Sequence, residues 1–315
     1  MRCAVALWLA VAAFAWDDPS PHALRAVQVN GGTLSYLDWG GSGFLSGFGQ
    51  SPHIFDDLAP KFATVRHVLG LTRRGCCGSV PAKAVFDTAA LEGDLVGFLK
   101  ALQVDKADFV AFSMAGAEVT ELALRHPDLV GGIVYVDSAY DFSADRPEFP
   151  DDPIKLEPGP EDNRNLEAGK QWFIRTFGFW SPAVEADARV VNLRPDGTMS
   201  MQAYPPEVGR ALWKGFTSYK PRFHSVKAPA LAIFVVPEHH PMVPPDSSRA
   251  TRAAADRWWR ERRLPALKRA VLSFQMARPD ARTVLMRDTQ HLCFIRERDE
   301  RRVYAEILRF LTSNP

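Results

Sequence analysis

Hydrophobic and polar positions fall into blocks of two kinds along most of the chain. Short runs rich in Val, Ile, Leu and Phe lie at residues 65–71, 107–112, 132–136, 230–236 and 282–286. Their apolar residues do not alternate with polar ones, which is typical of strands buried on both faces. Two further runs, 26–29 and 33–39, are separated by Asn30-Gly-Gly. Since Asn-Gly is a strong turn signal, these two runs predict a hairpin.

Stretches of helical character separate the strand candidates. They lie at residues 88–102, 116–125, 248–275 and 297–311, and Pro265 is expected to break the third of them. Strands alternating with helices predict an α/β fold whose mostly parallel central sheet is covered by helices on both faces.

Residues 141–223 lose the strand pattern and are rich in Pro, acidic and aromatic residues. This predicts a helical cap inserted into a core formed by residues 24–140 and 224–315. An insertion near the carboxyl ends of strands would lie over the ligand crevice as a lid, and its aromatic residues would line an apolar pocket. The alternative is an appendage that packs on the core without contacting substrate.

Composition limits the classes of function. The 315 residues are 46% hydrophobic and 24% charged, which excludes a disordered chain and a polytopic membrane protein. A formal net charge of +1 offers no field for polyanions, so nucleic acid is not expected as a partner. The sequence does not indicate an oligomeric state.

The N-terminus has the pattern of an export signal. Arg2 precedes an apolar run at residues 4–15 that ends in Ala-Phe-Ala. This run is too short for a stable membrane span, so residues 1–15 are predicted to be a signal peptide of a secreted or periplasmic protein. The alternatives are an uncleaved anchor and a wrongly assigned start.

Removal of that segment leaves three cysteines, Cys76, Cys77 and Cys293. An odd number leaves at least one thiol unpaired. Adjacent cysteines close only a strained ring, so a bond between Cys76 and Cys77 is not expected. Spacing does not decide whether Cys293 pairs with one of them or all three are simply small buried residues.

Ser113 is the candidate nucleophile. It lies where the apolar run 107–112 passes into the helix 116–125. A sharp turn of this kind, the nucleophile elbow, exposes the serine oxygen and needs small flanking residues, which are here Ala111 and Ala115 instead of glycine. The alternative role for such a serine is a helix N-cap. The backbone N–H of Met114, the next residue, would be one oxyanion-hole donor.

His291 is the candidate general base, because it alone of eight histidines follows the last predicted strand and precedes the final helix. The acid that would orient it has two candidates. Asp137 directly follows the run 132–136 and is preferred. After the run 230–236 a carboxylate is expected at position 240, but His240 stands there, and Glu238 comes two residues earlier. The second oxyanion donor is expected from Phe48 in a glycine-rich loop, for which a simple turn is the alternative.

These segments resemble the α/β-hydrolase superfamily over residues 26–312, and most closely its bacterial esterase-like members with a helical cap. The segments that carry the resemblance are Leu-Ser-Tyr-Leu-Asp-Trp-Gly at 34–40, Ser-Gly-Phe-Gly at 46–49, His-Ile-Phe-Asp-Asp-Leu-Ala-Pro at 53–60, Thr-Arg-Arg-Gly-Cys-Cys-Gly-Ser at 72–79, Phe-Ser-Met-Ala-Gly at 112–116 and Gln-His at 290–291. The resemblance implies a Ser-His-acid triad, an oxyanion hole from Phe48 and Met114, and no metal or organic cofactor.

The chain departs from this family pattern in three places. Ser46 stands where the family has histidine, Thr72 and Cys77 replace an aspartate and a glycine, and only residues 44–46 remain of the strand before the oxyanion loop. A central strand normally has about five or six residues. We therefore expect reduced stability or a displaced oxyanion loop.

A serine nucleophile excludes the sister reactions that need an aspartate, namely dehalogenation and epoxide opening. Hydrolysis of a carboxylic ester with an apolar acyl or alcohol part, through an acyl-enzyme, is therefore the predicted function. The alternative is a hydrolase-like binding protein that has lost turnover.

Overall fold

The computed structural model describes residues 22, 24–40, 45–46, 51–144, 151–154, 157–200 and 204–313. The strands in this part of the chain are β1 (Arg25–Val29), β2 (Gly32–Gly40), β3 (Leu45–Ser46), β4 (Val68–Leu71), β5 (Ala107–Phe112), β6 (Val130–Val136), β7 (Ala230–Val235) and β8 (Arg282–Met286). The helices are α1 (Thr88–Ala101), α2 (Ala115–Arg125), α3 (Leu166–Phe177), α4 (Pro182–Val191), α5 (Pro206–Ser218), α6 (Arg249–Trp258), α7 (Leu264–Ala277) and α8 (Glu297–Ser313). Single turns of 3₁₀ helix are η1 (Pro52–Phe55), η2 (Ala59–Phe62), η3 (Pro127–Leu129), η4 (Pro160–Asn163) and η5 (Phe223–Ser225).

The strands form two sheets. One is five-stranded in the order β3-β5-β6-β7-β8, and all its neighbours are parallel. The other is antiparallel in the order β1-β2-β4, and β4 contacts β3 at the edge where the two sheets meet. The predicted α/β class with a mostly parallel sheet is confirmed, as is the hairpin of β1 and β2.

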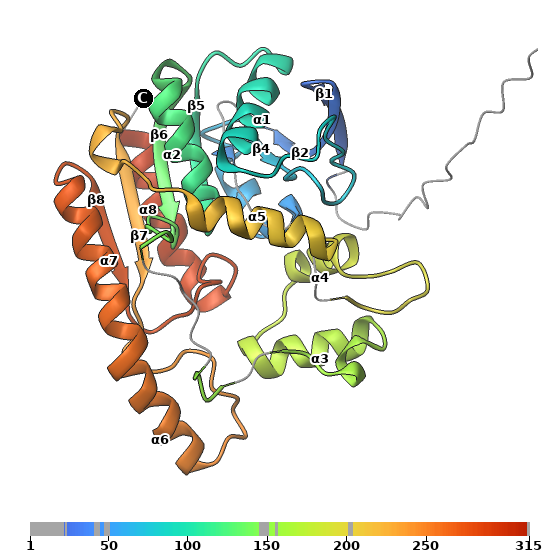
Figure 1. The fold of residues 1–315 in the computed structure, drawn as a ribbon, viewed down its shortest axis with the longest axis vertical. Coiled ribbons are helices and arrows are strands. Elements are labelled where there is room, and N and C mark those ends of the chain that lie inside the picture. The colour runs from blue at the N-terminus through green and yellow to red at the C-terminus, as the bar shows by residue number, and fades with distance from the viewer. Residues whose placement is uncertain are drawn as a thin grey trace, which may run out of the picture.

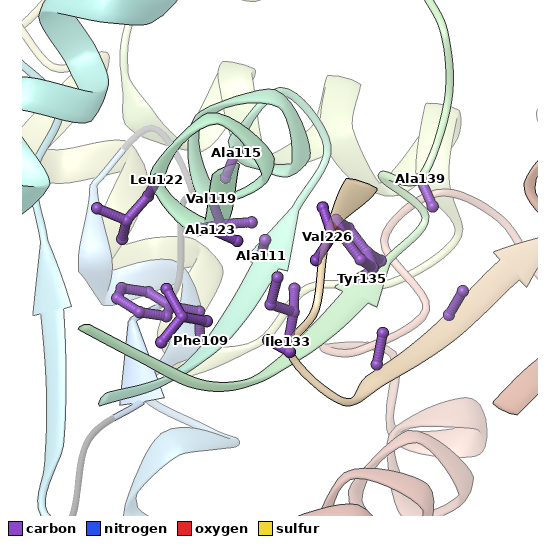
Figure 2. Close-up of a cluster of buried hydrophobic side chains, with 14 of the residues drawn as sticks. Phe109, Ala111, Ala115, Val119, Leu122, Ala123, Ile133, Tyr135, Ala139 and Val226 are labelled. Carbon is purple, nitrogen blue, oxygen red and sulfur yellow. The ribbon is translucent and has the colours of Figure 1, made fainter. Parts of the chain in front are cut away.

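Helices cover both faces of the parallel sheet (Figure 1). On β5, Phe109 and Ala111 belong to the apolar cluster under α1, α2 and α7, whereas Val110 and Phe112 belong to the cluster that packs against α8. Figure 2 shows the first of these clusters, with Phe109 and Ala111 below the side chains of α2. Burial on both faces explains why β5 has no alternation of apolar and polar residues. Each fully buried Val or Phe side chain stabilises the folded state by roughly 1.5–3 kcal/mol.

The helices α3 and α4 lie beyond the carboxyl ends of the parallel strands, on the side where the arrows of β6 and β7 point (Figure 1). Ser51, which precedes η1, is bonded to α4: its N–H and O–H both donate to Asp187 Oδ1, at 3.0 and 2.6 Å. These helices fall within the predicted cap, whose exact boundaries stay a prediction.

The predicted break at Pro265 is wrong in its position. The interruption is a π-helical segment, Trp259–Arg263, that joins α6 to α7. Pro265 follows this segment as the second residue of α7, so the interruption adjoins the proline and lies just before it. The strand expected at 65–71 also begins only at Val68.

Candidate active site

Ser113 occupies a strained turn between the end of β5 and the start of α2. Its φ is 55°, in the left-handed region that costs a non-glycine residue roughly 1–2 kcal/mol. The turn is held because the Ser113 N–H donates to the Val136 carbonyl at 3.3 Å, and the Ser113 carbonyl accepts from the Gly116 N–H at 3.2 Å. Its side chain lines a cavity.

The small residues around this turn are required by close packing. Ala111 and Ala115 are completely buried. A Cβ added to Gly116 would lie 2.2 Å from the Ser138 carbonyl oxygen, a distance that no real contact allows. The close approach that this elbow needs is therefore provided by a glycine three residues after the serine and by alanines at the flanks.

His291 lies in the loop between β8 and α8 and lines the same cavity as Ser113. Its Nδ1 is 2.6 Å from Asp137 Oδ2. A carboxylate can only accept here, so the proton belongs on Nδ1 and the lone pair of a neutral ring on Nε2. Phe112 packs on the imidazole with the ring centroids 4.4 Å apart, which fixes the plane of the ring.

Asp137 follows β6 directly and is itself tightly held. Its Oδ1 accepts from the Val235 N–H at 2.9 Å and from the Tyr140 hydroxyl, and its N–H donates to the Ile233 carbonyl at 2.7 Å. Its φ of 46° turns the side chain out of the strand direction. Both carboxylate oxygens are thus engaged, and Oδ2 is left for His291.

Tyr140 is a site residue that sequence reasoning missed. Burial raises the pKa of its hydroxyl, and the adjacent charge of Asp137 raises that pKa further, so the hydroxyl stays a donor. The available signal was its spacing, because a tyrosine three residues after a strand-terminal aspartate can turn back onto it.

The structure does not bring Glu238 to His291. Its side chain is 63% exposed, and its contact is with Arg287 Nη1 at 3.4 Å. His240, at the position where a carboxylate was expected, is buried and lies 3.3 Å from Asp152. Of the two candidate acids, only Asp137 is in contact with the imidazole.

The cavity has a volume of about 530 Å³ and is mostly apolar. From α3 it is lined by Gly169, Trp172, Phe173 and Phe177, whose spacing puts them on one face of the helix. Trp180 adds a fourth aromatic ring, which packs edge-on against Phe173 with the centroids 5.4 Å apart. Ser113 and His291 therefore face a pocket suited to an apolar ligand.

Of the two predicted oxyanion-hole donors, Met114 and Phe48, only Met114 lies within the described residues. Met114 begins the turn into α2 and lines the cavity next to Ser113. Phe48 lies outside the described residues. Of the strand before its loop, the structure describes Leu45 and Ser46 as β3, and the expected shortening of this strand stays a prediction.

The three cysteines include one pair of bonded neighbours, contrary to expectation, and one free thiol. A disulfide joins Cys76 to its neighbour Cys77, while Cys293 is a free, buried thiol, so a bridge to Cys293 is not formed. Within the described ranges, no cluster of three or more His, Cys, Asp or Glu side chains could hold a metal ion, and no helix is long and apolar enough to cross a bilayer.

Comparison with known proteins supports the resemblance seen in the sequence. A family model described as alpha/beta hydrolase fold matches residues 44–180. A pimeloyl-(acyl-carrier protein) methyl ester esterase from Neisseria meningitidis serogroup B is 32% identical over 108 residues. That stretch is 34% of this chain, and it spans only 39% of the length of that enzyme.

Solved structures extend the likeness to nearly the whole chain. E-2-(acetamidomethylene)succinate hydrolase superposes with a TM-score of 0.68 at 16% identity, over 92% of this chain and 99% of that one. An alpha/beta hydrolase fold protein from Chitinophaga pinensis gives a TM-score of 0.62 at 18% identity, over 94% and 99% of the two chains. At such identities the superpositions establish a shared fold.

Proposed function

We propose that this chain, of which residues 44–180 match a family model described as alpha/beta hydrolase fold, is a serine hydrolase that cleaves carboxylic esters through an acyl-enzyme intermediate. One observation carries the proposal. Ser113, strained at the elbow, faces the same cavity as His291, and the far nitrogen of that imidazole is bound to Asp137 at 2.6 Å. A nucleophile, a base and a group that orients the base are the three parts that covalent acyl transfer requires.

In the proposed acylation, Ser113 Oγ attacks the ester carbonyl carbon while its proton passes to His291 Nε2. The negative oxygen of the tetrahedral intermediate is stabilised by the backbone N–H groups of Met114 and Phe48. When the intermediate collapses, the alcohol leaves and takes the proton from Nε2. Water then repeats the sequence on the acyl-serine, so that a carboxylic acid is released and Ser113 is regenerated.

Asp137 acts on the imidazole and not on the substrate. Its carboxylate holds the proton on Nδ1, so that Nε2 is the acceptor, and stabilises the imidazolium that forms during attack. Tyr140 and the Val235 N–H keep the carboxylate in that orientation from the side opposite His291. All of these steps use the side chains and backbone of this chain, and the proposed reaction includes no metal or organic cofactor.

We propose a small-molecule ester with an apolar acyl or alcohol part as the substrate. The aromatic face of α3 supports this choice, since it would bury an alkyl or aryl group within reach of Ser113. A curated relative is named as a methyl ester esterase, which agrees with ester chemistry for this chain.

A fluorophosphonate probe tests the nucleophile directly. Wild type should be labelled at Ser113, and Ser113→Ala should not be labelled. Ser138→Ala serves as the matched control, because that serine is buried in the neighbouring loop with its hydroxyl donating to the Ala111 carbonyl. Absence of labelling in the folded wild type would contradict the proposal and favour a binding protein without turnover.

p-Nitrophenyl esters of increasing chain length test the substrate class. The cavity should favour medium-length acyl chains over acetate, mainly through KM, because longer chains bury more apolar surface. Trp172→Ala should remove part of that preference. A preference for acetate in both proteins would contradict an apolar acyl site.

We also propose that the protein is exported, with residues 1–15 as the cleaved signal. N-terminal sequencing of the mature protein recovered from the periplasm or the medium tests this. A mature chain that still begins at Met1 and stays in the cytoplasm would contradict it.

A further inference from the structure

Arg73 places a positive charge in the wall of a mostly apolar cavity. It follows β4, and its side chain is 6% exposed. It lines the same cavity as Ser113 and Met114, and among the described lining residues only His291 is also basic. A guanidinium is always charged in proteins, and removing it from water is costly unless the charge meets a partner.

Arg73 forms an ion pair with Glu118 of α2. Nε and Nη2 of Arg73 lie 2.9 and 2.7 Å from the same oxygen, Oε1, while Glu118 Oε2 is buried without a hydrogen-bond partner. Nη1 lies 3.5 Å from the Tyr204 hydroxyl, which also lines the cavity. The pair is therefore not the two-oxygen fork in which arginine binds a carboxylate most strongly.

Burial also weakens the negative charge of Glu118. It raises the pKa of this carboxyl to about 7, against the opposing effect of Arg73, and the charges of Asp94 and Arg74 also act on it. Burial of this carboxyl therefore opposes full neutralisation of the guanidinium at the cavity wall.

The adjacent arginine provides an internal comparison. Arg74 binds Asp94 with both oxygens, at 2.6 Å each, and donates to two backbone carbonyls, those of Val85 and Ala90. It does not line this cavity. Both arginines have partners within the fold, but of the two only Arg73 lines the cavity that contains Ser113.

We propose that Arg73 binds a carboxylate of the substrate, so that the preferred esters are half-esters of dicarboxylic acids with an apolar segment between the ester and the acid. This inference rests on the proposed ester hydrolysis and specifies its substrate class. A planar carboxylate matches the guanidinium fork, and the aromatic lining of α3 suits the methylene segment. The carboxylate that the cavity wall itself supplies, Asp187, is already bonded to Ser51.

The test compares matched substrates. Mono-p-nitrophenyl suberate and adipate carry a terminal carboxylate, and p-nitrophenyl octanoate and hexanoate are neutral esters of the same chain lengths. Wild type should show a kcat/KM ratio, half-ester over neutral ester, of about ten or more, since hydrogen bonds to charged groups are the stronger ones. The difference should lie mainly in KM. Free suberate should inhibit more strongly than octanoate.

Two variants distinguish substrate binding from a structural role. Arg73→Gln should bring the ratio to about one, and Arg73→Lys should restore part of it, whereas a purely structural arginine would lower both rates and leave the ratio unchanged. Glu118→Gln should raise the ratio at pH 8, because the neutral glutamine amide replaces the carboxylate that competes with the substrate for the guanidinium. This second variant decides the question even if Arg73→Gln does not fold.

The outcomes also separate this inference from the proposed function. Equal hydrolysis of half-esters and neutral esters by wild type would overturn the role of Arg73 and leave ester hydrolysis standing. No hydrolysis of either class, together with an unlabelled Ser113, would overturn both. A ratio that persists in Arg73→Gln would overturn the role of Arg73 alone.

Discussion

Asparagine in place of Asp137 changes one atom of the site and should reverse the direction of a hydrogen bond. The amide oxygen can still accept from the Val235 N–H and the Tyr140 hydroxyl at the position of Oδ1. The amide NH₂ then takes the place of Oδ2, 2.6 Å from His291 Nδ1. Since NH₂ only donates, Nδ1 must become an acceptor, and the proton of the neutral ring moves to Nε2.

This tautomer cannot take the proton of Ser113. Where the same exchange was made in a serine triad with intact geometry, kcat fell about 10⁴-fold. At about 1.36 kcal/mol for each tenfold, this is roughly 5 kcal/mol of transition-state stabilisation. The folded state should lose much less, about 1–3 kcal/mol, because one charge-assisted bond is replaced and the other two donors remain satisfied.

Steady-state hydrolysis of a p-nitrophenyl ester measures the first effect, and urea denaturation measures the second. Glu238→Gln is the matched control, because that side chain is exposed and distant from His291, and its activity should stay within about twofold of wild type. Activity of Asp137→Asn within tenfold of wild type would refute the reasoning. So would a large loss in Glu238→Gln.

Three further substitutions test the packing around the site. Gly116→Ala should destabilise the protein and distort the elbow because its Cβ would lie 2.2 Å from a backbone oxygen. Gly93→Ala is the control: this glycine has open space around it in α1, so the substitution should stabilise the protein by about 0.5–1 kcal/mol. Urea denaturation measures both effects, and equal effects would contradict this reasoning. Burial raises the pKa of Asp187 from 3.8 to about 6, so the folded state keeps a proton that the unfolded state releases, and stability should fall as pH rises through this window. Asp187→Asn should flatten that slope in urea midpoints taken from pH 4 to 7, and an unchanged slope would count against the assignment. Asp94→Ala should cost about 3–5 kcal/mol because it leaves Arg74 charged and buried without its partner, and a loss below 1 kcal/mol in the same assay would argue otherwise.

The order of the core elements could be predicted from the sequence because each depends on local pattern. Strands such as Ala107–Phe112 and Ala230–Val235 are apolar throughout because both of their faces are covered. Pro265 predicted an interruption of the long helix, and the structure has one at Trp259–Arg263. The proline alone does not indicate whether the helix breaks there or continues through a π-helical segment.

The residues of the site could be predicted from the sequence only in part, for a related reason. Ser113 and His291 are marked by their places beside predicted elements, so one sequence is enough to propose them. Asp137 was preferred as the acid because it follows a strand, but its contact with His291 joins residues 154 positions apart in the sequence. No local pattern shows which of two candidate carboxylates makes a contact of this kind. Arg73 was likewise hidden, because only the folded chain distinguishes it from Arg74 as the arginine that faces the cavity.

The carboxylate that binds His291 follows β6, so the connection after β7, residues 237–248, does not have to supply it. Met242 of this connection contributes to the wall of the cavity. Changes of length or sequence there can reshape the ligand space without disturbing the bonded pair of Asp137 and His291. In the proposed enzyme the connection after β7 contributes to the ligand space but not to the proposed proton transfer, which makes it a suitable segment in which to diversify a library.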